Sequence, residues 1–203
     1  NTASGAWSSV SGGRYNHAIG DFSFVGGGGS DNSTLGNWAV ANYSAILGGV
    51  VNTAGDPAVE DTSIGMYSTV SGGSYNNPTG ERANVSGGFG NKASGPNASV
   101  SGGRYNAANG DYSFIGGGGG STAAGGNTAF ANYSAVLGGY GNVAGDPTLT
   151  DHTIGDGSSV SGGYDNTASG NWASVSGGTS NTASGYYSSV CGGDFNTASG
   201  ARA

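Results

Sequence analysis

The chain has 203 residues, of which 45 are glycine, 34% are hydrophobic and only 8% are charged. This composition cannot supply the large aliphatic side chains of a thick globular core. A formal net charge of −7 with only five Lys and Arg residues argues against nucleic acid as a partner. No apolar run approaches the ~18 residues that would cross a membrane, so we expect no membrane contact by this segment.

The sequence is built from a fifteen-residue unit, which is clearest at residues 158–172 as SSVSGGYDNTASGNW. After a partial copy at residues 1–7, the unit starts eleven times, at positions 8, 23, 44, 68, 83, 98, 113, 134, 158, 173 and 188. Self-similarity at a fixed period is the signature of a repeat architecture, in which each unit stacks on its neighbours. We therefore expect a single repeat domain over residues 1–203.

The first half of each unit predicts a short strand followed by a tight corner. Position three is Val or Ile in every copy, and its neighbours are mostly small and polar, which is the alternation of a half-buried strand. Gly-Gly follows at positions five and six, where the chain can turn sharply. The predicted inward row is Val10, Val25, Ile46, Val70, Val85, Val100, Ile115, Val136, Val160, Val175 and Val190.

The second half of the unit predicts a second corner and a thinner inward contact. Position nine is Asn, which tolerates left-handed backbone and can form a ladder of amide hydrogen bonds through successive coils. Position eleven is Ala except at Pro78, and position thirteen is Gly except at Ala41 and Ala131. The predicted Asn ladder is Asn16, Asn52, Asn76, Asn91, Asn106, Asn142, Asn166, Asn181 and Asn196, which Asn37 and Asn127 join once the insertions are placed.

Stacking such units predicts an all-β fold, a parallel β-solenoid of about eleven fifteen-residue coils with two short strands per coil. At ~4.8 Å between coils, the solenoid would form a rod on the order of 50 Å long. Its inward side chains are small compared with the backbone entropy that folding removes. We therefore predict that copies of the chain associate along the rod.

The unit starts are separated by 15, 21, 24, 15 and 15 residues, and this series occurs twice. Residues 8–97 and 98–187 are thus two copies of a ninety-residue block, between the partial coil at 1–7 and a final coil at 188–203. Insertions in a solenoid leave it as loops, which are the usual place for a binding surface. The candidate receptor-binding residues in these loops are Ser30, Asp31, Asn32, Asp56, Glu60, Asp61, Ser121, Thr122, Asp146, Asp151 and His152.

No pattern of catalytic, cofactor-binding or metal-ligating residues emerges from the sequence. The acids of the two Asp-Pro loops could hold calcium, but their spacing fits no known metal loop, and solvated acidic loops are the preferred interpretation. Neither His17 nor His152 recurs with a Ser or an acid at matching spacing, so we expect no enzyme. The lone Cys191 replaces a Ser of other copies and is interpreted as a tolerated substitution.

Position fifteen of the unit carries an aromatic column. In a solenoid this column could serve as a sugar-stacking platform, or it could cover a coil edge or a subunit seam. We favour the structural interpretation, because Arg82, Asn97 and Gly157 interrupt the column. Its members are Trp7, Phe22, Tyr43, Tyr67, Tyr112, Tyr133, Trp172 and Tyr187.

The unit SxVSGGxxNTASGxx resembles the haemagglutinin-type repeats in the heads of trimeric autotransporter adhesins (YadA-like heads), and equally the repeats of phage tail fibres. The resemblance covers the whole chain. It implies a left-handed parallel β-roll and a homotrimer, intertwined or side by side, with the Val rows in its interior. The 21- and 24-residue coils are unlike a plain adhesin head and favour the tail-fibre alternative.

The preferred hypothesis for function is a structural and adhesive fibre segment, a trimeric rod that displays loops to a host receptor, glycan or matrix protein. Its location would be extracellular, on a bacterial outer membrane or a virion tail. A glycan depolymerase is the alternative, which would need paired carboxylates in a groove. An ice-binding solenoid is disfavoured, because the Thr ladder is interrupted by residues such as His17 and Ala107.

Overall fold

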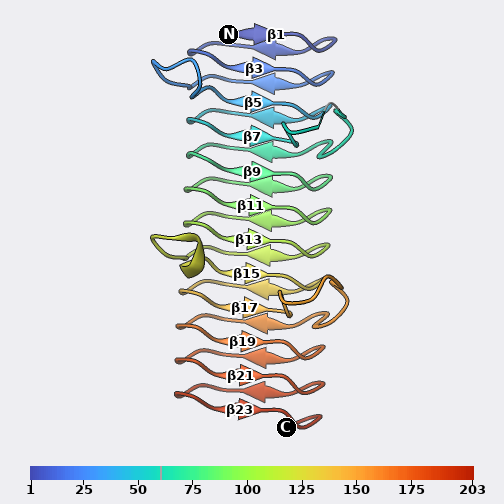
Figure 1. Ribbon diagram of the computed structural model, residues 1–203, viewed down its shortest axis with the longest axis vertical. Helices are drawn as coiled ribbons and strands as arrows, with labels where there is room; N and C mark the ends of the chain where they lie inside the picture. Colours follow the sequence, from blue (N-terminus) through green and yellow to red (C-terminus); the bar gives the residue numbers. More distant parts are fainter. Residues whose placement is uncertain (60) are drawn as a thin grey trace. The chain divides into compact units, whose positions relative to one another are not determined.

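The computed structural model describes residues 1–59 and 61–203, whose regular secondary structure is almost entirely short parallel strands joined by turns (Figure 1). The chain divides into two compact units, residues 1–97 and 98–203, and the division falls where the second ninety-residue block begins. In both units, each coil contributes two strands of two residues each. The parallel β-solenoid predicted from the sequence is confirmed.

The strands of the first unit lie in layers on opposite sides of the coils. Even-numbered strands pair in the order β2-β4-β6-β8-β10, odd-numbered strands pair in the order β1-β3-β5-β7, and β9 pairs with β11. The even-numbered strands are β2 (Ser9–Val10), β4 (Phe24–Val25), β6 (Ala45–Ile46), β8 (Thr69–Val70) and β10 (Asn84–Val85). The odd-numbered strands are β1 (Thr2–Ala3), β3 (His17–Ala18), β5 (Trp38–Ala39), β7 (Thr53–Ala54), β9 (Asn77–Pro78) and β11 (Lys92–Ala93).

The second unit repeats this arrangement and adds a 3-10 turn, η1 (Ala123–Gly125). Its even-numbered strands are β12 (Ser99–Val100), β14 (Phe114–Ile115), β16 (Ala135–Val136), β18 (Ser159–Val160), β20 (Ser174–Val175) and β22 (Ser189–Val190). Its odd-numbered strands are β13 (Ala107–Ala108), β15 (Thr128–Ala129), β17 (Val143–Ala144), β19 (Thr167–Ala168), β21 (Thr182–Ala183) and β23 (Thr197–Ala198). Within each series, consecutive strands are paired in parallel.

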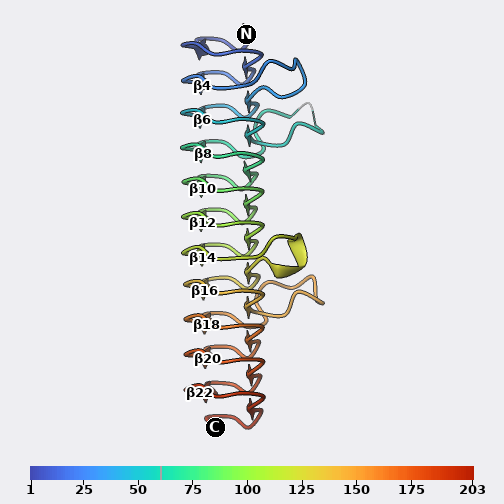
Figure 2. The ribbon, with the colours of Figure 1, turned by 90° about the vertical axis from the view of Figure 1, so that its left-hand side faces the viewer.

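The coils wind with a left hand. Figure 1 shows the odd-numbered strands in front and running to the right, while the even-numbered strands return to the left behind them. Figure 2 shows the two layers on opposite sides of each coil, with the chain descending by one coil per turn. A path that descends while turning in this sense is left-handed, as the resemblance to adhesin heads implied.

Each coil closes its own core. The side chains of Val25 and Ile46 are fully buried, as are those of Ala18 and Ala39 on the opposite strands. Pairing in register places Val25 directly between Val10 and Ile46, so the inward row is continuous along the coils. Apart from the half-buried Val10, every residue of the predicted inward row is buried by this chain alone. Burial of this row therefore gives no driving force for association between chains, and the threefold arrangement stays a prediction.

The Asn residues of position nine link neighbouring coils through the backbone. Asn52 Oδ1 accepts the backbone N–H of Asn76 at 3.0 Å, while Asn52 Nδ2 donates to Gly48 O at 3.1 Å and to Gly73 O at 2.9 Å. The same pattern recurs in both units, whereas direct amide-to-amide bonds, such as Asn37 to Asn16 at 3.1 Å, occur at only some steps. The ladder is thus mainly an amide-to-backbone ladder.

The backbone conformation at the corner differs from the prediction that placed the left-handed residue at Asn. The left-handed residue is the one before Asn, as at Tyr15 with φ 56° and Val51 with φ 57°, while the Asn side chain reaches inward to the glycine carbonyls. In the same turn Gly13 has φ 76°, and a Cβ there would lie 2.1 Å from Gly28 O of the next coil, so the Gly-Gly pair and the Asn belong to one corner and not to two. The second glycine of the Gly-Gly pair is therefore required by both conformation and space.

The odd-numbered sheet of the first unit is interrupted between β7 and β9. Pro78 lies in β9 and has no N–H to donate to β7. The side chain of Asn77 compensates in the amide orientation that satisfies both its oxygen and its nitrogen, in which Nδ2 donates to Thr53 O at 3.1 Å and to Gly55 O at 3.0 Å. A half-buried side-chain amide thus replaces the ladder bond that proline removes.

Candidate binding face

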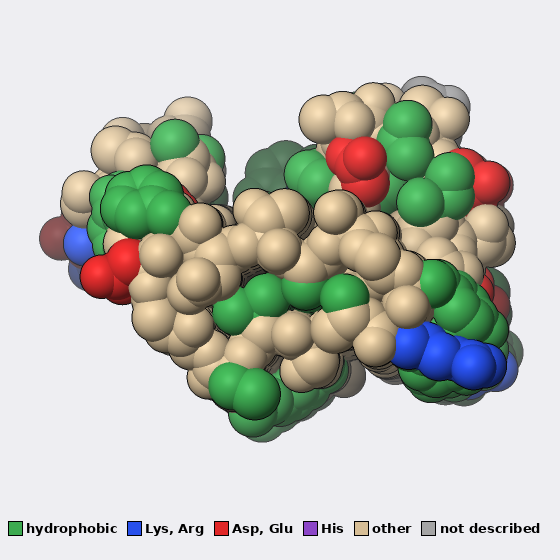
Figure 3. Space-filling model, turned by 90° about the horizontal axis from the view of Figure 1, so that it is seen from below, with side chains coloured by type: hydrophobic (Ala, Val, Ile, Leu, Met, Phe, Trp, Pro, Cys, Tyr) green, Lys and Arg blue, Asp and Glu red, His purple; other side chains and the backbone are tan. Residues whose placement is uncertain are grey.

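Both insertions of a unit project from the same side. They lie beyond the odd-numbered strands, one at each end of those strands, at residues 27–36 and 55–65 in the first unit and 117–126 and 145–155 in the second (Figures 1 and 2). We call the outer surface of the odd-numbered strands, together with the two loops beside it, the loop face. Figure 3, a view along the coils, shows a notch between two raised masses, with acidic side chains on both sides.

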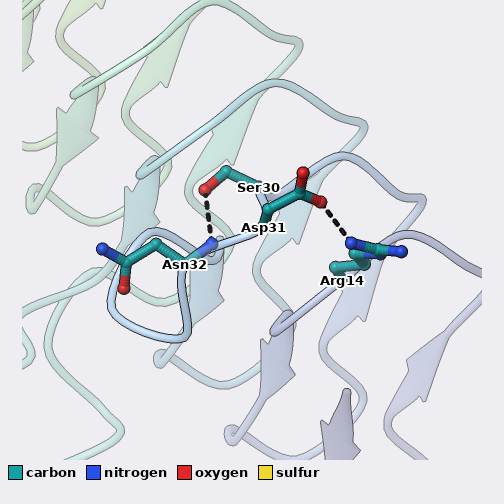
Figure 4. A network of polar contacts seen from close by, with 4 residues as sticks. All are labelled: Arg14, Ser30, Asp31 and Asn32. Carbon is teal, nitrogen blue, oxygen red and sulfur yellow. Dashed lines mark hydrogen bonds and ion pairs between the residues drawn. The ribbon is translucent and has the colours of Figure 1, made fainter.

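The loop at residues 27–36 is held by short-range hydrogen bonds. Asn32 N donates to Ser30 Oγ at 3.1 Å, and Thr34 N donates to Asn32 Oδ1 at 3.0 Å. Arg14 of the preceding coil forms an ion pair with Asp31, and their side chains are 68% and 90% exposed (Figure 4). Such an exposed pair adds little stability. It does place one positive and one negative group at the outer corner of the first unit.

The corresponding loop of the second unit has a different surface. Ser121 and Thr122 are exposed before η1. The loop lies against Tyr140, because a Cβ on Gly120 or Gly125 would come 2.6 or 2.5 Å from its ring. The first unit has Val50 at the position of Tyr140. The two loops therefore share a place in the block but offer different groups.

The acids of the Asp-Pro loops cap turns within those loops. Asp146 Oδ1 accepts Thr148 N at 3.0 Å, and Asp151 Oδ1 accepts Thr153 N at 2.9 Å. Asp56 and Asp61 accept the backbone N–H of Ala58 and Ser63 in the same way. Hydrogen bonds from Ser63, Thr148 and Thr153 lower the pKa of Asp61, Asp146 and Asp151, respectively. These carboxylates are ionised at neutral pH and shape the loops.

A pocket of about 270 Å³ opens on the loop face of the first unit. Its walls come from the outer surface of the odd-numbered strands and from the Asp-Pro loop. The lining residues are Ile19, Trp38, Val40, Pro57, Val59 and Thr62. The Trp38 ring also contacts His17, with ring centroids 4.5 Å apart. Partial burial, and secondarily the positive N-terminus, lower the pKa of His17.

The second unit fills the corresponding space with its own side chains. Phe130 and His152 take the places of Val40 and Thr62, ninety residues further along. Their ring centroids are 4.2 Å apart, and His152 Nδ1 is 2.6 Å from Phe130 O. Phe130 is only 7% exposed. His152, predicted as a receptor-binding residue, is therefore half-buried against the solenoid.

The aromatic column packs ring on ring. Centroids of Trp7, Phe22, Tyr43 and Tyr67 follow one another at 4.8, 4.8 and 4.9 Å, and the guanidinium of Arg82 lies 5.5 Å from the Tyr67 ring. The inner rings cover one another's faces, so those faces are not open to a sugar ring. This geometry favours the interpretation of the column as the cover of a coil edge. In the second unit the Trp172 ring occupies the space beside Gly157, where the column is interrupted.

The structure distributes the predicted receptor-binding residues over separate loops. Asp31, Asn32, Asp61, Ser121, Thr122 and Asp151 are exposed, and Ser30, Asp56, Asp146 and His152 are half-buried. Glu60 lies outside the described residues. Among residues 1–59 and 61–203, no three His, Cys, Asp or Glu side chains are grouped so that they could hold a metal ion.

Sequence reasoning missed the pocket. None of its lining residues was among the candidate receptor-binding residues, because the prediction rested on the polar residues of the loops. The available signal was the apolar side chains Ile19, Trp38 and Val40 at positions ten and twelve of the unit. Plain coils carry small polar residues there, such as Thr167 and Ser169.

The chain matches no protein-family model and no curated protein. Within the described part of the chain, no helix has the length and apolar character required to span a membrane.

Proposed function

We propose that this chain is an attachment segment, a β-solenoid scaffold that presents its loop faces to a receptor, glycan or matrix protein outside the cell. The observation that carries this proposal is the placement of the insertions. Within each unit, both rise on the same side of the coils and enclose one face, although they interrupt different corners of different coils (Figures 1 and 2). Loops on a rigid scaffold are a common way to build a binding surface.

The differences between the two loop faces support the same proposal. The inward Val or Ile, the Gly-Gly pair and the Asn recur in both blocks, whereas the loops and the floor carry different groups. The first unit has an ion pair and an apolar pocket, and the second has η1 and a tilted Phe130–His152 ring contact. Substitutions at scaffold positions would disrupt every neighbouring coil. The loops differ at most of their positions, as do corners of the plain coils such as Arg82 and Trp172, and such differences on the loop faces fit surfaces whose role is recognition.

The test is a loop-free variant whose plain coils come from the chain itself. Residues 30–35, 56–64, 120–125 and 146–154 would be removed, so that each long coil returns to fifteen residues. Ala41 and Ala131 must become Gly in the same variant. In a plain stack a Cβ at position thirteen, as at Gly80, would lie 2.1 Å from the carbonyl oxygen of Gly95 in the next coil.

The unaltered chain and the loop-free variant, labelled at the exposed Cys191, would be applied to arrays of glycans and immobilised matrix proteins. We expect binding by the unaltered chain and its loss without the loops, with partial recovery when the loops of one unit are restored. Equal binding by the loop-free variant would place recognition on the plain coils and refute the proposal. Release of oligosaccharide from a bound glycan would refute it in favour of a depolymerase.

We also propose that copies of the chain associate as a homotrimer, and that the contact lies on the even-numbered strands. Their outer surface is mostly Ser, but Leu47 is 54% exposed beside the half-buried Phe24, and Leu137 is 56% exposed beside Phe114. An apolar spot on a flat face of small residues suits close contact between chains.

Sedimentation would test this association. We expect a mass near three times the 19.5 kDa of one chain, and a shift toward one chain when Leu47 and Leu137 are both changed to Ser. Leu149→Ser is the matched control, because Leu149 is an exposed leucine on the loop face. A single-chain mass for the unaltered protein at micromolar concentration would refute the homotrimer.

A further inference from the structure

The pocket of the first unit corresponds to a space that side chains occupy in the second unit. In the second unit two aromatic rings, Phe130 and His152, contact each other between the strands and the Asp-Pro loop, with centroids 4.2 Å apart and ring planes tilted by 32°. In the first unit the same two positions carry Val40 and Thr62, which line a pocket of about 270 Å³. The smaller Val40 and Thr62 leave room at these two positions, and Trp38, whose counterpart in the second unit is the smaller Thr128, forms part of the wall beside them.

The walls define the chemistry of a ligand. Five of the six lining residues are apolar, and the Thr62 hydroxyl is the polar group among them. Trp38 contributes its indole, which His17 supports by ring contact from the neighbouring strand. Asp56 precedes the lining residue Pro57 and Asp61 precedes the lining residue Thr62, and hydrogen bonds from Ser63 lower the pKa of Asp61, which keeps it ionised at neutral pH. Negative charge on the loop disfavours an anionic ligand.

The volume of the pocket limits the size of the ligand that it can hold. An apolar cavity of ~150 Å³ in an engineered protein stays dry and binds benzene. A pocket of about 270 Å³ can therefore accept a larger ring system than benzene. We propose that the first unit binds a small uncharged aromatic molecule of one or two fused rings, in the space that Phe130 and His152 fill in the second unit.

This proposal does not depend on the attachment function, since a small molecule could bind whether or not the loop faces recognise a surface. Indole is the probe, and benzoate is its anionic counterpart. Binding would be followed by calorimetry and by NMR shifts of the Val40 and Thr62 methyl groups. We expect one indole per chain, shifts at both methyl groups, and benzoate binding at least tenfold weaker.

The decisive variant gives two positions of the first unit the side chains of the second unit. Val40→Phe together with Thr62→His should fill the pocket and weaken indole binding at least tenfold, while circular dichroism shows the fold retained. Trp38→Thr, which copies Thr128, should also weaken binding and introduces no larger side chain. Leu149→Ala, at an exposed leucine in the second unit, should leave binding unchanged. Unaltered indole affinity in both pocket variants, or no methyl shifts at millimolar indole, would refute the proposal.

Discussion

The methyl group of Ala41 occupies the space that a side chain on Gly55 would need. A Cβ built on Gly55 would lie 2.8 Å from Ala41 Cβ and 2.8 Å from Ala41 N, and Ala131 and Gly145 repeat the relationship, with Cβ atoms 2.8 Å apart. In plain coils position thirteen is Gly, because the next coil stacks directly against it. The Asp-Pro insertion carries the next coil outward after Gly55, and this makes room for alanine.

Gly55→Ala should therefore destabilise the first unit by about 2–4 kcal/mol. The new methyl group meets Ala41, and the backbone at Gly55 has φ 102°, which an L-residue adopts only with strain. Denaturant unfolding would measure the change. Gly48→Ala in the same coil is the matched control, because no atom lies within 4 Å of its Cβ position, and we expect a change below ~0.5 kcal/mol. Equal losses for the two variants would contradict this account.

Asn52→Ala should lower stability by about 2–5 kcal/mol, because it leaves Gly48 O, Gly73 O and the N–H of Asn76 without their partner in a buried site. Asn52→Asp keeps the acceptor for Asn76 but turns an oxygen toward the two carbonyls. Burial favours the protonated acid, so this variant should be more stable relative to the unaltered protein at acid pH than at neutral pH. Thermal unfolding at both pH values would check the sign, and a pH-independent loss would contradict it.

The side chain of Asn77 should matter only because Pro78 is present. Asn77→Ala removes the donors to Thr53 O and Gly55 O, and we expect a loss of about 1–3 kcal/mol. With Pro78 changed to Ala, the backbone regains an N–H for β7, and the same Asn77→Ala change should cost about 1 kcal/mol less. A double-mutant cycle by denaturant unfolding measures this coupling. Additive losses would show that the two residues act separately.

His17 should titrate below the value of about 6.5 that is usual for a free imidazole. Partial burial disfavours its charged form, so the folded state binds this proton less readily than the unfolded state. The first unit should be most stable above pH 6.5 and should lose stability as the pH falls through that value toward the pKa of the folded state. NMR titration of the imidazole gives the midpoint, and the pH dependence of unfolding should flatten in His17→Ala. A midpoint at or above the usual value would contradict the prediction.

The repeating part of the fold could be predicted because it follows from spacing alone. A β-branched residue every fifteen positions, with Gly-Gly after it, requires stacked coils with Val25 and its equivalents inside, and those residues are buried. The corners could not be predicted in the same way. General preferences assign left-handed backbone to Asn or Gly, but here aromatic Tyr15 and Tyr43, and even β-branched Val51, adopt it. Stacking of neighbouring coils overrides the local preference.

The pocket could not be predicted because it depends on contacts between a loop and a neighbouring coil. Val40 and Val59 are separated by nineteen positions in the sequence, and nothing in their local pattern pairs them. Comparison of the two blocks offered the better signal, since Val40 and Thr62 correspond to Phe130 and His152. Paired changes in size at two positions of a duplicated block indicate a shared space.

The Asn hydrogen bonds also keep their length whatever number of residues separates the partners. The distance from the backbone nitrogen to the preceding Asn oxygen is 3.0 Å across 15 residues at Asn52, 3.1 Å across 21 at Asn37 and 3.0 Å across 24 at Asn76. The two insertion points are therefore tolerant grafting positions. Foreign peptides whose ends meet could be displayed there at chosen intervals, as epitopes on a vaccine carrier or as enzyme-recognition tags, without disturbing the coils that hold them.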